Sequence, residues 1–228
     1  MNVAVVVAAH PDDEVLGCGA TVARLVSEGW AVHVLILSNG VTSRSNSRDM
    51  SRHMPELSEL AKSAERANNI LGVTSLKLFS LPDNRMDGIQ LLDVIKLIEV
   101  EIESCKPCLV LTHHAGDVNI DHRIIHDAVI AACRPVPGHS VRSLLFFEVP
   151  SSTEWRPPSS GKQFEPDFFY DVTNFLDRKL LALKVYSSEM RSFPHPRSVE
   201  AVNHLAKWRG ATVGCLSAEA FMLGRAIV

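Results

Sequence analysis

The sequence of 228 residues is 46% hydrophobic and 21% charged, which is typical of a globular protein with a substantial core. Its formal net charge is −3 and its acidic and basic residues are interspersed, so no basic field would recruit nucleic acid or an anionic membrane surface. A chain of this length accommodates one large domain, whereas two full domains would be cramped.

The N-terminal run from Met1 to Ala9 is apolar, but it lacks the positively charged start and the cleavage site of a secretory signal. It leads directly into His10, which favours a buried β-strand over a signal segment. No apolar run approaches the roughly 20 residues that cross a bilayer. We therefore expect a cytoplasmic protein without a transmembrane segment.

Apolar runs of strand length alternate with longer segments of helical period along the first 150 residues. The expected strands are 2–9, 31–37, 75–79, 109–112 and 141–149, and the expected helices are 16–28, 55–71, 89–104 and 121–133. This order predicts an α/β fold with a Rossmann-like open, mostly parallel sheet and helices on both faces.

The pattern changes after Pro150, although we expect a single domain over residues 1–228. Residues 151–166 are rich in Ser and Pro and predict a surface loop. A short strand at 168–172, a helix at 174–186 and a helical tail with loops follow. The Rossmann-like core would thus end near residue 150, with residues 151–228 as an extension that completes the fold.

Two clusters of metal-ligand side chains follow predicted strands. The first is the run from His10 to Glu14, with the sequence His-Pro-Asp-Asp-Glu, and the second lies between His113 and His122. Ligands of open α/β sheets bind beyond the carboxyl ends of the strands, so both clusters are expected at the same edge. The polar stretch 38–53 also follows a strand and is typical of an active-site loop.

The composition of these clusters favours a divalent metal. Adjacent Asp12 and Asp13 would be costly at a buried strand end without a cation to neutralise them. Three His and Asp ligands with one position open for water are typical of catalytic zinc. As alternatives, Asp12 or Asp13 caps the following helix, His122 is a surface residue in a first helical turn, and His113 is an ordinary strand-end histidine.

The run Ala9-His10-Pro11-Asp12-Asp13-Glu14, with the later Asp121-His122, resembles the LmbE-like, or PIG-L, family of zinc-dependent N-acetylsugar deacetylases. Supporting matches extend the resemblance over most of the chain. They are Glu65 with Ala67, Leu71-Gly72-Val73, Lys179 with Ala182 and Tyr186, and Ala218-Glu219-Ala220-Phe221.

The resemblance implies that His10, Asp13 and His122 bind Zn²⁺, with Fe²⁺ or Mn²⁺ as alternatives. Asp12 would be the general base that deprotonates water activated by the metal, and this water would attack the acetamide carbonyl. Glu14 would not bind the metal but would help to hold the residues of the site in place.

Two positions depart from the family pattern. Many members have a histidine where this chain has Asn119, whose amide donates a hydrogen bond to an oxyanion but carries no titrating proton. The role of proton donor must then pass to His113, His114 or His195, or be absent. Many members also have an arginine where this chain has Lys62, whose ammonium gives less directional control than a guanidinium.

The residues expected to contact substrate come from several segments. The stretch 193–198 is expected to border the cleft, and Trp155 would stack on a sugar or a base unless it is simply an exposed loop aromatic. The remaining candidates lie in the polar stretch, in the second cluster and at the position that departs from the family. They are Arg44, Lys62, His113 and Asp117.

We therefore expect a metal-dependent hydrolase that removes an N-acetyl group from an amino sugar or a nucleotide- or lipid-linked conjugate. Its partner would be this small molecule, and members of the family often form homo-oligomers. One alternative is an amidase acting on a non-sugar or thiol-conjugate amide, and another is a metal-binding relative without activity. A third is a nucleotide-binding module, because Gly17-Cys18-Gly19 opens a helix after a strand, although the last glycine of that fingerprint is missing.

Overall fold

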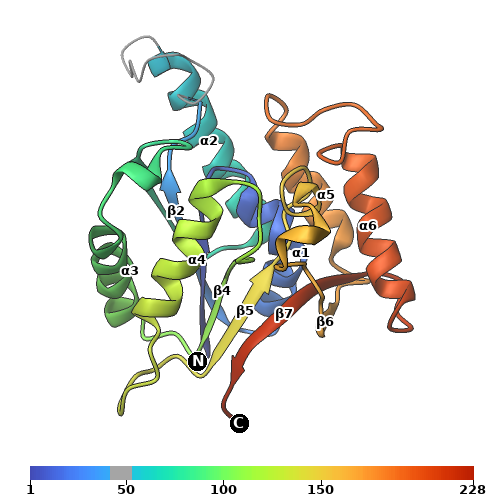
Figure 1. Cartoon of the computed structure of the whole chain (residues 1–228). Coiled ribbons are helices and arrows are strands. Elements are labelled where there is room, and N and C mark those ends of the chain that lie inside the picture. The colour runs from blue at the N-terminus through green and yellow to red at the C-terminus, as the bar shows by residue number, and fades with distance from the viewer. Residues whose placement is uncertain (42–52) are drawn as a thin grey trace.

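The computed structural model describes residues 1–41 and 53–228, and its centre is a seven-stranded sheet (Figure 1). The strand order is β3-β2-β1-β4-β5-β7-β6, and the first five strands run parallel. The strands are β1 (Val3–Ala8), β2 (Ala31–Ser38), β3 (Ser75–Leu81), β4 (Leu109–His113), β5 (Ser143–Phe147), β6 (Phe168–Asp171) and β7 (Ala218–Ala226).

Strand β1 lies inside the sheet, between β2 and β4, and its sequence VAVVVA suits a strand that is covered on both faces. Successive side chains of a strand point to opposite faces. Ala4, Val6 and Ala8 accordingly belong to one hydrophobic core, whereas Val5 and Val7 belong to the other.

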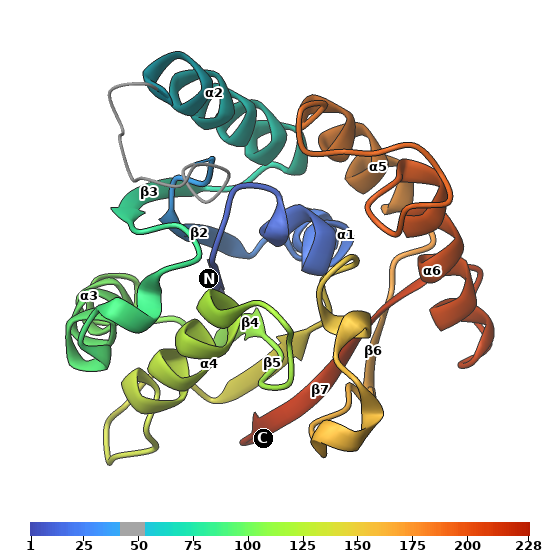
Figure 2. The ribbon, with the colours of Figure 1, turned by 45° about the horizontal axis from the view of Figure 1, so that its top comes forward.

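Helices cover both faces of the sheet (Figure 2), which confirms the predicted α/β architecture. One core includes residues of α1, α2, α5 and α6, and the other includes residues of α3 and α4. The helices are α1 (Asp13–Ser27), α2 (Met54–Leu71), α3 (Leu91–Cys105), α4 (Ile120–Ala132), α5 (Leu176–Val185) and α6 (Val199–Ala211). No helix of the described residues is long and apolar enough to cross a membrane.

The C-terminal segment differs from the prediction. Residues expected to belong to a helical tail with loops form the strand β7, which runs antiparallel between β5 and β6. Glu219 of this strand is buried and pairs with the buried Lys179 of α5, and it also accepts hydrogen bonds from the backbone of Ala20 and Thr21 in α1. A charged residue at a buried strand position obscures the alternating pattern of the strand, because its partner lies far away in the sequence.

The strand order reverses direction at β1 and β4, since β2 and β3 lie on one side and β5 lies on the other. Such a reversal places a crevice outside the carboxyl ends of the two strands. The segments that leave β1 and β4 are joined there, because the backbone N–H of Ala9 donates to Nε2 of His113 at 2.8 Å. The two predicted ligand clusters therefore meet at one edge of the sheet.

Candidate metal centre

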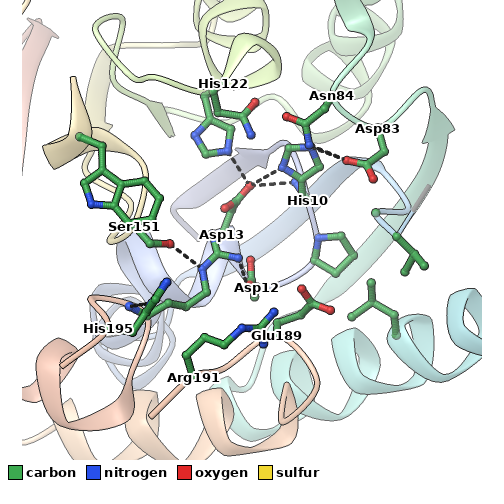
Figure 3. Close-up of a pocket in the computed structure, with 17 residues that line it drawn as sticks. His10, Asp12, Asp13, Asp83, Asn84, His122, Ser151, Glu189, Arg191 and His195 are labelled. Carbon is green, nitrogen blue, oxygen red and sulfur yellow. Dashed lines mark hydrogen bonds and ion pairs between the residues drawn. The ribbon is translucent and has the colours of Figure 1, made fainter. Parts of the chain in front are cut away.

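A polar cavity of about 310 Å³ lies beyond the carboxyl ends of β1 and β4 (Figure 3). His10, Asp12 and Asp13 enter it from the segment after β1, and His122 enters it from the first turn of α4. The far wall of the cavity comes from loops after residue 150, including Trp155.

Three potential ligand atoms converge at the floor of the cavity. Oδ2 of Asp13 lies 3.2 Å from Nδ1 of His10 and 3.1 Å from Nε2 of His122, and the three groups offer ligand atoms within 4.8 Å of one another. Nε2 of His122 is buried without a hydrogen-bond partner among the described residues. A divalent cation would satisfy this nitrogen, so the donor set fits the metal that the family resemblance implies.

Each histidine faces a carboxylate with its other ring nitrogen. Nε2 of His10 lies 3.0 Å from Oδ2 of Asp121, and Nδ1 of His122 lies 3.0 Å from Oδ2 of Asp117. Metal-binding histidines are commonly held in this way, because the carboxylate fixes the ring orientation and strengthens the nitrogen that faces the metal.

Asp83 forms a second acidic contact to His10, with its Oδ1 at 3.3 Å from Nε2. His10, Asp83 and Asp121 would make a second cation site on distance alone. However, Asp121 already accepts the backbone N–H groups of Asn84 at 2.6 Å and of Met86 at 3.0 Å. We therefore assign this group to the support of His10.

The charge balance at the floor favours a cation. Burial lowers the pKa of His10, but hydrogen bonds to Asp121 and Asp13 outweigh it and raise this pKa to about 10. Burial lowers the pKa of His122 too, but the negative charges of Asp13 and Asp117 outweigh it and raise this pKa to about 9. Burial also acts to raise the pKa of Asp13, yet the neighbouring histidines hold it well below its ordinary value. Positive charge is thus stabilised where the three ligand atoms meet.

Asp12 and Asp13 point to different partners, as expected for adjacent residues. Asp12 precedes α1 with a left-handed φ of 108°, a conformation that is uncommon for residues other than glycine and often marks functional sites. Oδ2 of Asp12 accepts a hydrogen bond from Nη1 of Arg197 at 3.1 Å. Burial raises the pKa of Asp12 well above its ordinary value, and the guanidinium opposes this change.

The buried side chain of Glu14 fixes the backbone of Asp12. Its Oε2 accepts the N–H of Asp12 at 3.0 Å, while Oε1 accepts the hydroxyl of Tyr186 at 2.6 Å and the side-chain amide of Asn68 at 2.9 Å. Burial raises the pKa of Glu14 to about 7 despite these donors. The unusual turn at Asp12 is therefore tied to both α2 and α5.

Asn119 and His195 also border the cavity. Asn119 caps α4, since its Oδ1 accepts the N–H of Asp121 at 2.9 Å, and this contact leaves the Nδ2 group of the amide as the donor. Nδ1 of His195 accepts the N–H of Arg197 at 3.1 Å, so a neutral ring carries its hydrogen on Nε2. The ring packs edge to face with Trp155 at 5.8 Å between centroids.

Three residues expected to contact substrate, Asp117, His113 and Lys62, are not among the described residues that border the cavity. Asp117 is buried beneath His122, where it also accepts the hydroxyls of Ser152 and Thr153. His113 is buried too and stacks on the His122 ring at 3.9 Å between centroids, with its Nε2 taken by Ala9. Lys62 is exposed on α2 and pairs with Glu59, and Arg44 lies outside the described residues.

Comparisons with known proteins agree with this geometry. The model of the PIG-L family, described as GlcNAc-PI de-N-acetylase, matches residues 5–133, which is more than half of the chain. The chain belongs to the PIG-L family. It is 30% identical over 188 residues to a protein of Escherichia coli (strain K12) described as the uncharacterized deacetylase YaiS, covering 80% of this chain and 89% of that one.

Other relatives of this PIG-L chain show that the fold serves more than one named activity. The 4-oxalmesaconate hydratase of Pseudomonas putida (strain KT2440) is 29% identical over 208 residues, covering 82% of this chain and 73% of the hydratase. The solved N,N'-diacetylchitobiose deacetylase of Pyrococcus horikoshii shares the fold with a TM-score of 0.77 at 18% identity, covering 98% of this chain and 84% of that one.

Gly17, in the segment after β1, is required for the packing of α1 against the sheet. A Cβ on Gly17 would lie 2.3 Å from Cδ2 of Phe147, so this glycine lets α1 approach β5 closely. Asp12, Asp13 and Glu14 occupy the helix start where a nucleotide phosphate would bind, and their charges would repel it. The nucleotide-binding alternative therefore finds no support here.

Several residues that border the cavity were not predicted from the sequence. Asp83 and Asn84 follow β3 and were not singled out, since a lone Asp-Asn pair is typical of any turn. Arg197 was included only in a stretch expected to border the cleft. Its contact with Asp12 spans 185 residues, so no local spacing could have indicated it.

Proposed function

We propose that this chain is a zinc-dependent hydrolase that removes the N-acetyl group from an amino sugar or a sugar conjugate. The observation that carries the proposal is the convergence of His10 Nδ1, Asp13 Oδ2 and His122 Nε2 beside Asp12 at the floor of one cavity. The deacetylase descriptions of the family model and of the Escherichia coli relative support the same reaction.

His10, Asp13 and His122 would hold the metal, which when bound makes water a nucleophile at neutral pH and polarises a carbonyl group. Asp12 borders the same space and is held by Arg197, so its carboxylate can take the proton that the attacking water loses.

Two further residues suit the later steps of amide hydrolysis. The Asn119 amide borders the cavity with its Nδ2 group as donor, so it can stabilise the oxyanion that forms from the acetamide carbonyl. Of the three histidines considered as proton donors, His195 borders the cavity, whereas His113 and His114 do not. The proton that Asp12 takes from the water can then pass to the leaving amine, and His195, whose neutral ring offers its Nε2–H, would hydrogen bond to the group that departs.

The cavity suits a small polar substrate. Its volume of about 310 Å³ lies at the lower end of the range for small-molecule sites, which fits one sugar unit with the remainder of a conjugate outside. Polar side chains line most of it, and Trp155 offers an aromatic face at the wall. Hydroxyl-rich pyranose rings combine these two demands, because they hydrogen bond at their edges and stack on aromatic residues.

Acetate release from a panel of N-acetylated free, nucleotide-linked and lipid-linked sugars tests the proposal, with zinc-loaded protein and the Asp13→Ala variant as a matched control. We expect the wild-type protein to release acetate from at least one class and the variant from none. An acetamide of a thiol conjugate and a simple non-sugar acetamide should be included, since turnover of these alone would favour the broader amidase alternative. Metal binding without turnover of any amide would favour an inactive relative.

A second candidate function is the addition of water to a carbon–carbon double bond. The Pseudomonas putida relative, which is named as a hydratase, favours it, because this relative aligns over most of both chains. An unsaturated dicarboxylate belongs in the same panel. Loss of its ultraviolet absorbance, without acetate release from any sugar, would support hydration over deacetylation.

A further inference from the structure

Arg197 joins the C-terminal side of the cavity to Asp12. Its Nη1 donates to Oδ2 of Asp12 at 3.1 Å, and its Nε donates to Oγ of Ser151 at 2.9 Å. These two hydrogen bonds place the guanidinium between Asp12 and Ser151, both of which Figure 3 labels. The Arg197 side chain is 21% exposed and that of Asp12 is 1% exposed, so the ion pair is largely shielded from water.

The backbone around Arg197 is also held in place. Its N–H donates to Nδ1 of His195, and its carbonyl accepts the N–H of Arg191 at 3.0 Å. The next residue, Ser198, caps α6 by accepting the N–H of Ala201 at 3.0 Å. The guanidinium therefore extends toward Asp12 from a segment that is fixed on both sides, as a positioning group requires.

The contact leaves one oxygen of Asp12 for chemistry. Arg197 occupies Oδ2, and the described part of the chain forms no hydrogen bond to Oδ1. A guanidinium restricts the direction of a carboxylate more strongly than an ammonium does. Without it, the buried Asp12 carboxylate would lose its ion-pair partner beside the like charge of Asp13, and it would be free to turn toward the ligand atoms of the metal site.

We propose that Arg197 is a positioning residue, which grips Asp12 by one oxygen and thereby directs the other at the reacting water. The proposal deepens the hydrolytic function described above and rests on it. It also differs from a role in substrate binding, because the hydrogen bonds of Nη1 and Nε already commit the guanidinium to Asp12 and Ser151.

Steady-state kinetics of Arg197→Gln and Arg197→Lys, each with its zinc content measured, test the proposal. For Arg197→Gln we expect kcat to fall about 100-fold, within the range that a positioned base contributes, while KM changes less than about threefold. The lysine variant should regain part of kcat, because it keeps the charge but not the two contacts. Both variants should hold as much zinc as the wild-type protein.

Arg209→Gln is the matched control. Arg209 is also 21% exposed and also pairs with a carboxylate, that of Glu148, through Nε at 2.8 Å and Nη2 at 2.7 Å. Neither residue borders the cavity. This variant should lower the thermal unfolding midpoint while leaving kcat within about twofold of the wild-type value, which would separate positioning of Asp12 from general stability.

A double-variant cycle in thermal unfolding tests the pairing without any substrate. We expect Arg197→Gln combined with Asp12→Asn to lower the unfolding midpoint by less than the sum of the two single changes, because each single change already breaks the same contact. Additive losses would overturn the proposal, as would a rise in KM at unchanged kcat. Failure of the wild-type protein to release acetate from any sugar would instead reject the proposed function.

Discussion

The ligand side and the C-terminal side of the cavity differ in how their residues are placed along the sequence. His10 and Asp13 lie within four consecutive residues, and His122 lies at a second strand end that the parallel topology brings alongside. Trp155 comes from a short 3-10 helix and His195 and Arg197 from a loop, and local spacing does not connect these segments with the ligands. A short motif can thus encode the metal ligands, whereas the groups facing them depend on the whole fold.

Removal of the metal acts on the ligand side of the cavity and should reduce the rate of acetate release more than any other change considered. We expect protein stripped with a chelator to lose at least about 1000-fold in acetate release, because water then lacks an activating cation. Stoichiometric zinc should restore the rate. Measurement of acetate before and after zinc addition checks this, and chelated protein with undiminished turnover would refute a metal-dependent reaction.

Asp12 lies next to the ligand Asp13 and pairs with Arg197 of the C-terminal side, so Asp12→Asn affects the point where the two sides of the cavity meet. The amide keeps the shape of the side chain but cannot take a proton from water, so we expect kcat to fall about 100- to 10,000-fold with zinc content unchanged. Kinetics with parallel metal analysis test this. Retention of full activity would remove Asp12 from the role of base, and loss of zinc would show that it acts as a ligand.

Asn119→Asp separates helix capping from chemistry. The carboxylate can still accept the N–H of Asp121, so α4 should keep its cap, but the Nδ2 donor is lost. We expect kcat to fall about 100-fold, as for removal of one oxyanion donor, with little change in the unfolding midpoint. An unchanged kcat would assign Asn119 to the helix start alone.

Trp155→Ala should have the smallest effect of these changes and should act on binding. Trp155 is 53% exposed at the cavity wall, whereas Trp208, at 66%, lies outside the cavity and serves as the control. We expect KM for the best sugar substrate to rise about 10-fold, equivalent to the loss of about 1.4 kcal/mol, with kcat nearly unchanged. Equal KM values for the two variants would exclude stacking on Trp155.

The same contrast explains what the sequence could and could not predict. Four of the five parallel strands are apolar runs, as β1 illustrates, whereas β3 was predicted from the alternation of Leu76 and Leu78 with polar residues. Strand β7 was missed, since Glu219 interrupts its apolar pattern and is balanced by Lys179, 40 residues away. Only the tertiary structure reveals that a charge at this position is compatible with a buried strand.

In the candidate site too, some residues were predicted from the sequence and others were not. The family motif predicted that His10, Asp13 and His122 come together, because residue type and strand position both indicate a metal edge. The substrate contacts expected for His113 and Asp117 followed from their membership of the second cluster, yet both residues are buried beneath His122. Spacing cannot distinguish a residue that faces the cavity from one that holds its neighbour. Lys62 and Arg44 stay predictions.

Zinc content measured in wild-type and His122→Ala protein tests without any substrate whether His10, Asp13 and His122 bind the metal. After zinc loading and dialysis, we expect about one tightly held zinc per wild-type chain and far less in the variant, since His122 supplies one of three ligands. An Ala variant of His126, a buried histidine of α4 that is not among the cavity residues, controls for damage to the helix. Full zinc content in His122→Ala would exclude His122 as a metal ligand.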